Sequence, residues 1–266
     1  AVLRAGRRDA EIHLMGVEPV PGEPAAVADC NGERALVVAD YHAGIERGLR
    51  REGVELDSRA DQRRGSVLTL VDRHAPDRVV FLGDLTDAIG DVRDSEREEA
   101  TALLAAVTER VPVTLIKGNH DGGTEALSDA FDRVRLSSGR GARIGDVGFA
   151  HGHTWPGRDV LSGEVLCVGH EHPTVKLEDE VGGSRVERVW LRSTVDPEPF
   201  VDWYDSDIAV PDELIVFPAF NDRSGGTWVN VEGQGFLAPF LPDVLVEEAI
   251  EAYLLDGTRL GPYRSV

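Results

Sequence analysis

The stretch LIKGNHDGG at residues 115–123 decides how the chain is interpreted. Its apolar residues continue a run that starts at residue 111 and is typical of a buried strand. The run ends in glycine, and an amide, an imidazole and a carboxylate follow without a spacer, in Asn119, His120 and Asp121. Because ligands bind at the carboxyl ends of strands in open α/β sheets, we expect these side chains to lie at a functional edge.

The segments before this stretch alternate between strand and helix patterns. Continuous apolar runs predict buried strands at RALVVAD (34–40), DRVVFLGD (77–84) and VPVTLIKGN (111–119). The residues between them predict one or two helices within 44–74 and a helix over 95–110. The last of these helices opens with Ser95 and Glu98, which have the spacing of a capping box. This order is typical of a parallel sheet covered by helices.

The segments after residue 121 favour short strands. Strand-like runs lie at 134–136, 142–151, 165–170, 174–179 and 184–192, and 242–257 is either a helix or a pair of apolar strands. We therefore expect two sheets packed together with helices outside, in a single domain of residues 1–266. Residues 193–212 are rich in Pro and Asp and are predicted to be a long ordered loop or an insertion.

The composition is strongly acidic. The 48 Asp and Glu residues exceed the 28 Lys and Arg residues, the formal net charge is −20, and Lys117 and Lys176 are the only lysines. Such a surface holds water and counter-ions, so we expect a halophilic protein that stays soluble in concentrated salt. The charge disfavours a broad nucleic-acid footprint, which is normally basic, but molar salt shortens the screening length to about 3 Å and weakens this argument.

The two cysteines indicate a reducing compartment. Cys167 lies in an apolar run, Cys30 lies in the turn-like DCNGE, and their spacing indicates no disulfide framework. No stretch approaches the ~20 apolar residues of a membrane span. The arginines at positions 4, 7 and 8 are followed by no continuous apolar segment, so we expect no secretion signal. We expect a cytoplasmic protein without membrane contact, and no feature of the sequence sets its oligomeric state.

Six of the eight histidines fall in short clusters that directly follow apolar runs. The clusters are Asp40-Tyr41-His42, Asn119-His120, His151-Gly152-His153 and His170-Glu171-His172, and Gly83-Asp84 adds a carboxylate in the same kind of position. Carboxylate, amide oxygen and imidazole are ligands that Mn, Fe, Zn and Co accept. Alternate residues of an extended segment face the same side, so Asp40 with His42 can address one site. The pattern predicts a pair of metal ions, which Asp84 can bridge.

Each motif taken alone also has a structural interpretation. A lone Gly-Asp is usually a turn, His-Gly-His suits a surface loop, and Asp-x-His suits a hydrogen-bonded pair at a strand end. His13 and His74 have no such neighbours and are expected to be structural or solvent-facing. The joint occurrence of five motifs, each at a predicted strand end, favours the metal site.

The order of these motifs resembles the calcineurin-like metallophosphoesterase superfamily, over residues 40–172. The resemblance implies that one metal is held by Asp40, His42, Asp84 and His172. It implies that Asp84 bridges to a second metal held by Asn119, His151 and His170. His151 is chosen over His153 because it directly follows a strand, which leaves His153 near the substrate or behind the ligands.

The same resemblance implies a four-layer α/β fold, in which two mixed β-sheets pack face to face and helices flank them. It also implies two-metal hydrolysis of phosphoester bonds, with manganese expected first and Zn, Fe or Co as alternatives. The ions would share a hydroxide and stabilise the attacking and leaving oxygens. His120 would protonate the leaving oxygen or stabilise its charge. Asp87 is expected to orient His120, with Asp121 as the alternative or as a structural residue of the turn.

Three segments resemble a narrower group, the archaeal and bacterial phosphoesterases that include DNA-ligase-associated enzymes. These are ADYHAGIERGLRREG (39–53), GHEHP (169–173) and PAFNDRSGG (218–226). The similarity implies a phosphodiesterase or nuclease acting on DNA or nucleotides, near proteins of DNA repair. The Ser/Thr phosphatases of the superfamily continue their second motif with Asp-Arg-Gly, whereas Ala88 and Ile89 follow Asp87 here, which argues against a phosphoprotein substrate.

Candidate substrate contacts are His153, Arg47, Arg51, Asn221 and Arg223. Arg47 and Arg51 lie in a helix that is expected to begin just after His42, and from there a guanidinium can reach a phosphate. Arginines that solvate the surface of an acidic helix give the same pattern. A monoesterase acting on a small metabolite is an alternative function that only the pocket shape separates from a diesterase. A non-catalytic scaffold is disfavoured, because His120 and all seven ligand residues are present.

Overall fold

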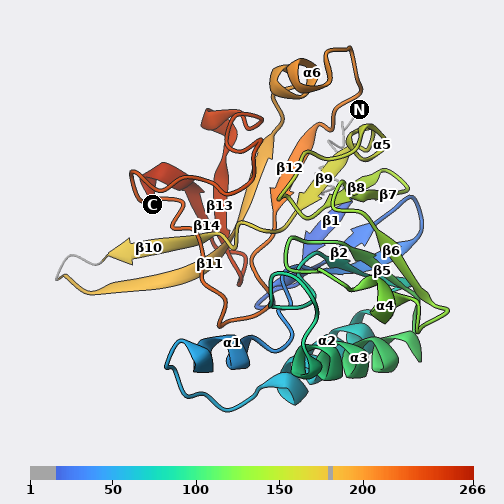
Figure 1. Cartoon of the computed structure of the whole chain (residues 1–266). Coiled ribbons are helices and arrows are strands. Elements are labelled where there is room, and N and C mark those ends of the chain that lie inside the picture. The colour runs from blue at the N-terminus through green and yellow to red at the C-terminus, as the bar shows by residue number, and fades with distance from the viewer. Residues whose placement is uncertain (1–15, 179–181) are drawn as a thin grey trace, which may run out of the picture.

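Two β-sheets form the centre of the structure, a computed structural model that describes residues 16–178 and 182–266 (Figure 1). The N-terminal arginines, His13 and the last residue of the strand expected over 174–179 lie outside the described residues. The first sheet has six strands in sequence order, β1 (Val17–Pro19), β2 (Ala25–Asp29), β3 (Arg34–Val38), β4 (Arg78–Leu82), β5 (Val113–Ile116) and β6 (Val134–Ser137). β3 to β6 run parallel and β1 and β2 antiparallel, so the sheet is mixed.

The second sheet is also mixed and has the order β14-β13-β11-β12-β9-β8-β7, with β10 paired to β11. Its strands are β7 (Ala142–Ile144), β8 (Val147–Ala150), β9 (Val165–Val168), β10 (Thr174–Glu178), β11 (Ser184–Thr194), β12 (Glu213–Val216), β13 (Glu251–Leu254) and β14 (Arg259–Pro262). β8, β9 and β12 are its parallel strands. The hairpin of β10 and β11 extends away from the rest of the molecule in Figure 1.

Helices cover the outer faces of the two sheets. The first sheet carries α1 (Ile45–Arg51), α2 (Ala60–His74), α3 (Asp94–Thr108) and α4 (Glu125–Ser128). The second carries α5 (Arg158–Leu161) and α6 (Glu198–Tyr204), and the short turns η1 (Glu247–Ala249) and η2 (Tyr263–Ser265) flank β13 and β14. Figure 1 shows α2 and α3 below the first sheet and α5 and α6 at the opposite end.

Three apolar clusters hold these layers together. The central cluster lies between the sheets and includes Phe149, Cys167, Trp190 and Phe217, with the rings of Trp190 and Phe217 4.7 Å apart. The second lies under α2 and α3, and the third lies under α5, α6 and the segment 238–245. Because both faces of the central parallel strands are buried, these strands have continuous apolar sequences rather than alternating ones. The predicted four-layer α/β fold is therefore confirmed.

Several local predictions differ from the structure. Residues 242–257 form no α-helix, since the turn η1 interrupts them before β13. The capping-box prediction is wrong, because α3 begins at Asp94 and it is Glu96 whose side chain accepts the main-chain N–H of Arg93, at 3.1 Å. Residues 193–212 contain the end of β11 and the helix α6.

The chemical state of the cysteines and the length of the helices agree with the sequence. Cys30 and Cys167 are free and buried. Burial raises the pKa of the Cys30 thiol to about 12, which keeps it protonated at neutral pH. Within the described ranges, no helix combines the length and apolar character needed to cross a membrane.

Replacing Phe149 tests the packing between the sheets. Phe149 is fully buried, so Phe149→Ala should lower the free energy of unfolding by about 3–5 kcal/mol. Ile89, which is 76 % exposed, provides the control, and Ile89→Ala should change it by less than about 0.5 kcal/mol. Urea unfolding followed by tryptophan fluorescence measures both, and equal effects would show that Phe149 does not belong to a cooperative core.

Candidate metal centre

The predicted ligands leave their strands in left-handed backbone conformations. Eight described non-glycine residues have positive φ, and five of them are predicted ligands with φ from 43° to 70°: Asp40, His42, Asp84, His170 and His172. This region is unfavourable for residues with a side chain, and such conformations gather at functional sites. The strained turns direct side chains from both sheets into one space.

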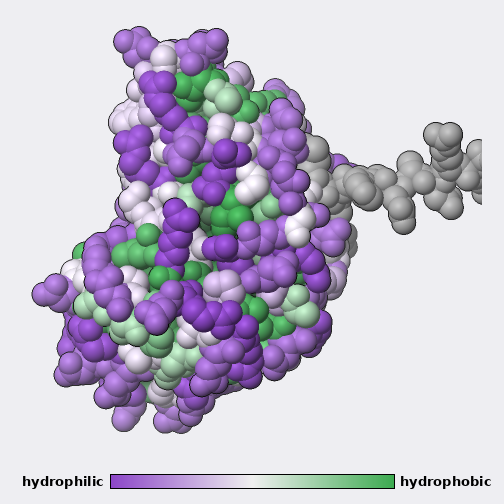
Figure 2. Space-filling view, turned by 90° about the vertical axis from the view of Figure 1, so that its right-hand side faces the viewer, coloured by the Kyte–Doolittle hydropathy of each residue, from purple (hydrophilic) through white to green (hydrophobic). Residues whose placement is uncertain are grey.

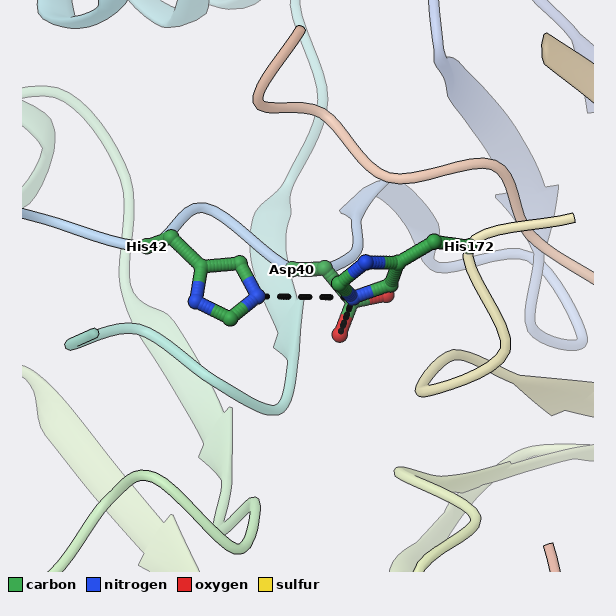
Figure 3. A group of neighbouring side chains, drawn as sticks. All are labelled: Asp40, His42 and His172. Atoms are coloured by element: carbon green, nitrogen blue, oxygen red, sulfur yellow. Dashed lines mark hydrogen bonds and ion pairs between the residues drawn. The ribbon is translucent and has the colours of Figure 1, made fainter. Parts of the chain in front are cut away.

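Asp40, His42 and His172 form a first group, whose ligand atoms lie within 4.8 Å of one another. His172 Nε2 lies 3.2 Å from Asp40 Oδ1 and 3.3 Å from His42 Nε2, as Figure 3 shows. The Nδ1–H of His172 donates to the carbonyl of Gly225 at 2.8 Å. A carbonyl can only accept, so the lone pair of His172 is on Nε2 and faces the other two ligands.

Asp84, His151 and His170 form a second group with the same spacing. His151 Nε2 lies 3.3 Å from Asp84 Oδ2 and 3.1 Å from Asn119 Oδ1, so the amide of Asn119 adjoins this group. The Nδ1–H of His151 donates to the carbonyl of Leu82 at 3.1 Å, which again leaves Nε2 free to bind a cation.

Asp84 lies between the two groups. Its Oδ2 is 3.3 Å from His151 Nε2 and 4.0 Å from His42 Nε2, so one carboxylate faces ligands of both. Its Oδ1 accepts the main-chain N–H of His120 at 2.8 Å. Gly118 permits this approach, because a Cβ atom at that position would lie 2.0 Å from Asp84 Oδ1.

The charge balance of the cluster suits bound divalent cations. Burial alone would raise the pKa values of Asp40 and Asp84, but the surrounding imidazoles hold both below their usual range. Burial would lower the pKa of His151, but Asp84 and Asp40 raise it to about 9. In the metal-free protein a proton on His151 therefore supplies positive charge that the buried carboxylates require, and a cation would displace it.

His120 lies beside Asp84 and is partly open to solvent. Its Nε2 is 3.9 Å from Asp84 Oδ2, and 25 % of its side chain is exposed. Its Nδ1 makes a short hydrogen bond to the main-chain oxygen of Asp87, whereas the Asp87 carboxylate lies 3.2 Å from His42 Nδ1. The Asp87 carboxylate, which was expected to orient His120, therefore faces the ligand His42, and only the main-chain oxygen of Asp87 contacts the His120 ring.

Asp121 holds the turn that carries Asn119 and His120. Its Oδ2 accepts the main-chain N–H of Gly118 at 2.8 Å, and its Oδ1 accepts that of Thr86 at 3.1 Å. Burial, with a contribution from Asp84, raises the pKa of Asp121 to about 6. Both contacts are those of a structural residue of the turn, which is one of the two roles predicted for Asp121.

The structure places His153 close to the second group. Its ring centroid lies 5.3 Å from that of His151 and 6.2 Å from that of His170. Its Nδ1 is buried without a hydrogen-bond partner among the described residues. His153 therefore adjoins the ligands, which agrees with a position near the substrate or behind the metal.

The arginines of α1 do not extend to the ligand groups. Arg47 donates to Ser95 Oγ at 3.1 Å, at the start of α3. Arg51 is exposed near the end of α1. In this conformation the arginines solvate the helix surface, which is the alternative that the sequence left open.

Asn221 braces the first ligand turn and is not exposed to substrate. The residue is almost fully buried, and its Nδ2 donates to the carbonyls of Tyr41 at 3.0 Å and His42 at 3.3 Å. Its main-chain N–H donates to the carbonyl of Asp40 at 3.3 Å. The predicted substrate contact is instead a positioning residue for the turn that carries Asp40 and His42.

Arg223 belongs to a buried ionic network behind the same turn. It donates to Glu46 at 3.0 Å, and Arg63 donates to Glu46 at 3.0 Å and to Glu99 at 2.7 Å. Glu99 in turn accepts the main-chain N–H of Gly44 at 2.8 Å, two residues after His42. The sequence did not single out this network, because charged residues within amphipathic helices are usually exposed.

Glu171 is a second buried carboxylate that sequence reasoning missed. It lies between His170 and His172 in sequence, and its oxygens accept the main-chain N–H groups of Leu237 and Ala238 at 2.9 Å and 2.6 Å. It therefore fixes the segment 237–238 to the ligand turn. The GHEHP motif provided the signal, because successive residues of an extended segment point to opposite sides, so that Glu171 faces away from His170 and His172.

The sandwich of two sheets and the clustered ligands define a metal-dependent hydrolase of the α/β class. Residues 33–240 match the sequence model of the calcineurin-like phosphoesterases. Since the match covers most of the chain, this protein belongs to the calcineurin-like phosphoesterase family and hydrolyses phosphoester bonds. The family and the enzyme class that the sequence indicated are confirmed, and the clustered ligands agree with divalent-metal dependence.

Two solved structures resemble this chain. The nuclease MPE of Pseudomonas putida is 16 % identical with a TM-score of 0.52, over 90 % of this chain and 97 % of that chain. The phosphoesterase Yfce of E. coli is 13 % identical with a TM-score of 0.38, over 85 % of this chain and 96 % of that chain. No curated protein matches the chain. At 16 % identity, the first of these likenesses supports the fold alone.

The central position of Asp84 leads to a prediction for Asp84→Asn. The amide loses the charge that both groups share, so the variant should lose the metal pair. Metal content after gel filtration, measured by mass spectrometry, checks this. Asp132→Asn, at an exposed position, is the matched control and should keep wild-type metal content. Two metals bound to Asp84→Asn at wild-type affinity would contradict the shared role.

Asn221→Ala tests the brace behind the first group. Loss of the two hydrogen bonds to Tyr41 and His42 should weaken one of two metal-binding steps by about 10–100-fold and leave the other little changed. Calorimetric titration of the metal-free protein resolves the two steps. Asn230→Ala removes a comparable loop-bracing amide, which bonds Lys176 and Val266, and should leave both steps unchanged.

Proposed function

We propose that this protein hydrolyses phosphodiester bonds by a two-metal mechanism, with manganese as the preferred metal. The observation that carries the proposal is the pair of ligand groups with Asp84 between them, its Oδ2 facing His42 of one group and His151 of its own, and with His120 beside Asp84. Asp40, His42 and His172 would hold one cation, and His151, His170 and Asn119 would hold the other. The bound cations would polarise the phosphate and activate the attacking water.

His120 would act as the general acid. Its position beside Asp84 and its partial exposure allow its Nε2 to face a bound phosphoester from the solvent side. The short hydrogen bond from Nδ1–H to the main-chain oxygen of Asp87 fixes the ring orientation. A proton on Nε2 then transfers to the leaving oxygen as the ester bond breaks.

Nucleic acid or nucleotides are the substrate class that we propose. Two features support it: the similarity of three sequence segments to the group that includes DNA-ligase-associated enzymes, and the fold shared with the nuclease MPE of P. putida. The analogy of fold alone does not define a substrate. A role beside DNA-repair proteins in a high-salt cytoplasm follows from the same reasoning and from the net charge of −20.

A monoesterase that acts on a small metabolite is the competing function. The relative rates on a nitrophenyl diester, a nitrophenyl monoester and single-stranded DNA separate the two, each with added manganese in molar KCl. Hydrolysis of the monoester alone would replace the phosphodiesterase proposal. Two bound metals without hydrolysis of any of the three substrates would exclude the catalytic proposal itself.

His120→Ala tests the general acid. The variant should keep both metals but lose about 10²–10⁴-fold in kcat on DNA, whose leaving oxygen needs a proton. The loss should be smaller on the nitrophenyl diester, because nitrophenolate leaves without protonation. His74→Gln, at the end of α2, should retain wild-type rates. Wild-type rates of His120→Ala on both substrates would show that another group supplies the proton.

A further inference from the structure

The segment 193–212 carries an exposed tryptophan that the metal centre does not use. Trp203 lies on α6 and is 56 % exposed. Its ring stacks on that of Trp155, with centroids 4.5 Å apart and planes inclined by only 4°. One indole face is therefore covered, and the residue keeps a large exposed surface although it lies in an acidic, hydrophilic segment.

Two buried phenylalanines fix the position of Trp155. Trp155 packs against Phe200 with ring centroids 5.7 Å apart and against Phe240 at 5.8 Å. Both phenylalanines are fully buried in the cluster on the outer face of the second sheet. Because Trp155 is fixed, it holds the indole of Trp203 in one orientation, and a flat group that stacks on Trp203 would lose little additional freedom.

The stack lies close to the second ligand group. Trp155 follows His153 by two residues, which limits the separation of their Cα atoms to about 7 Å. The ring of His153 lies 5.3 Å from that of His151. The neighbouring loop approaches the same ring, since a Cβ atom at Gly139 would lie 2.5 Å from His153 Cε1. A chain-like substrate that extends from the metals on the side of His153 would therefore pass near the stack.

Two arginines contact Tyr204, which follows Trp203 in sequence. The guanidinium of Arg158 lies 4.7 Å from the Tyr204 ring centroid and that of Arg140 lies 5.9 Å from it. Arg140 donates to the Tyr204 hydroxyl at 2.8 Å, and Arg158 donates to its carbonyl at 3.0 Å. Within residues 16–178 and 182–266, no carboxylate lies within 4.0 Å of either guanidinium, so both keep donors for an anion.

Acidic residues border the same surface. Asp202 and Asp205 are exposed neighbours of Trp203 in sequence, and Asp159 follows Arg158. They repel a phosphate chain except where it runs over the two arginines. In Figure 2 the upper part of the molecule, the end that carries α6 in Figure 1, shows apolar surface interspersed with hydrophilic surface. Attraction at this surface must therefore come mainly from the rings.

We propose that the stack of Trp203 on Trp155, with Arg140 and Arg158 beside it, is a subsite that holds an unpaired base of single-stranded nucleic acid. This inference rests on the proposed phosphodiesterase function. Every base has a flat π face, and stacking on a fixed aromatic ring tolerates any sequence. A base in a duplex has its faces covered, so the subsite selects single strands, and the arginines contact the flanking phosphates.

The test measures binding of fluorescein-labelled oligothymidylate to the full chain in EDTA, which prevents hydrolysis. An abasic strand of equal length keeps the phosphates and lacks the bases. Wild type should bind oligothymidylate at least tenfold more tightly than the abasic strand. Trp203→Ala should remove this preference, and Trp203→Phe should restore most of it. No preference in wild type, or a preference that Trp203→Ala retains, would overturn the proposal.

Trp228→Ala is the matched control. Trp228 is 40 % exposed, and in the described part of the chain no ring contact joins it to the stack. Its removal should change the affinity for oligothymidylate by less than twofold, and a loss equal to that of Trp203→Ala would overturn the assignment to α6. Salt provides a second criterion, because two phosphate contacts limit the slope of log affinity against log salt to about −1.4. A much steeper slope would also overturn the proposal.

Hydrolysis of the nitrophenyl diester by wild type tests the proposed function separately. If wild type binds single strands through Trp203 but hydrolyses no diester, the phosphodiesterase proposal fails and the subsite stands as a binding site. If the diester is hydrolysed but oligothymidylate binds no better than the abasic strand, only the subsite fails. Tight binding of a folded protein or a second copy of this chain to α6, with no preference for bases, would assign the surface to a different partner. Such a result would overturn the proposed base-binding subsite.

Discussion

The buried carboxylate of Asp84 imposes the constraint on which the rest of the site depends. A negative charge removed from water requires positive charge or hydrogen-bond donors around it. Here they come from both sheets, since His151 follows β8 and His42 follows β3, and a main-chain N–H from the turn after β5 completes the set. The two sheets must therefore meet with their strand ends at one place, and the apolar cluster between them fixes that geometry.

This constraint explains why strain and glycine occur where they do. Asp84 and His42 have left-handed φ values of 45° and 49°, and their side chains face the shared space. Gly118 then allows the backbone of the next strand to come within contact of the carboxylate. The cost of these conformations is offset by the surrounding hydrogen bonds, of which those of Asn221 to the ligand turn are an example.

The sequence predicted the part of the site that follows directly from strand ends. The positions of Asp40, Asp84 and His151 depend on apolar runs followed by a polar residue, and these patterns are local. Partners outside those patterns could not be predicted in the same way. Asn221 and the network around Arg63 act through contacts between residues 17 to 180 positions apart, and nothing in the local pattern distinguishes a buried arginine from an exposed one.

Strand length does not separate the strands that were predicted from those that were missed, since β5 and β12 have four residues each and only β5 was predicted. β1 has only three residues and lies at a sheet edge, and β12 follows the Pro- and Asp-rich segment that obscures its start. Residues 242–257 were predicted to be either a helix or a pair of strands, because their apolar residues suit both structures. The segment packs against α6 and the second sheet and forms the strand β13, and the sequence does not show this packing.

An acidic protein that binds an anionic substrate must overcome the repulsion between their charges. With a net charge of −20, the surface as a whole repels phosphate, and the arginines nearest to the first ligand turn are engaged, Arg223 with Glu46 and Arg47 with Ser95. The long-range interaction with an anion is therefore repulsive, and concentrated salt screens it. What remains is short-ranged: cations at the ligand groups and flat rings such as Trp203. Screening weakens both less than it weakens an exposed arginine, since stacking depends on contact area and bound cations would be enclosed by buried ligands. An acidic surface and a polyanionic substrate are thus compatible only if binding is concentrated at the metals and at aromatic contacts close to them.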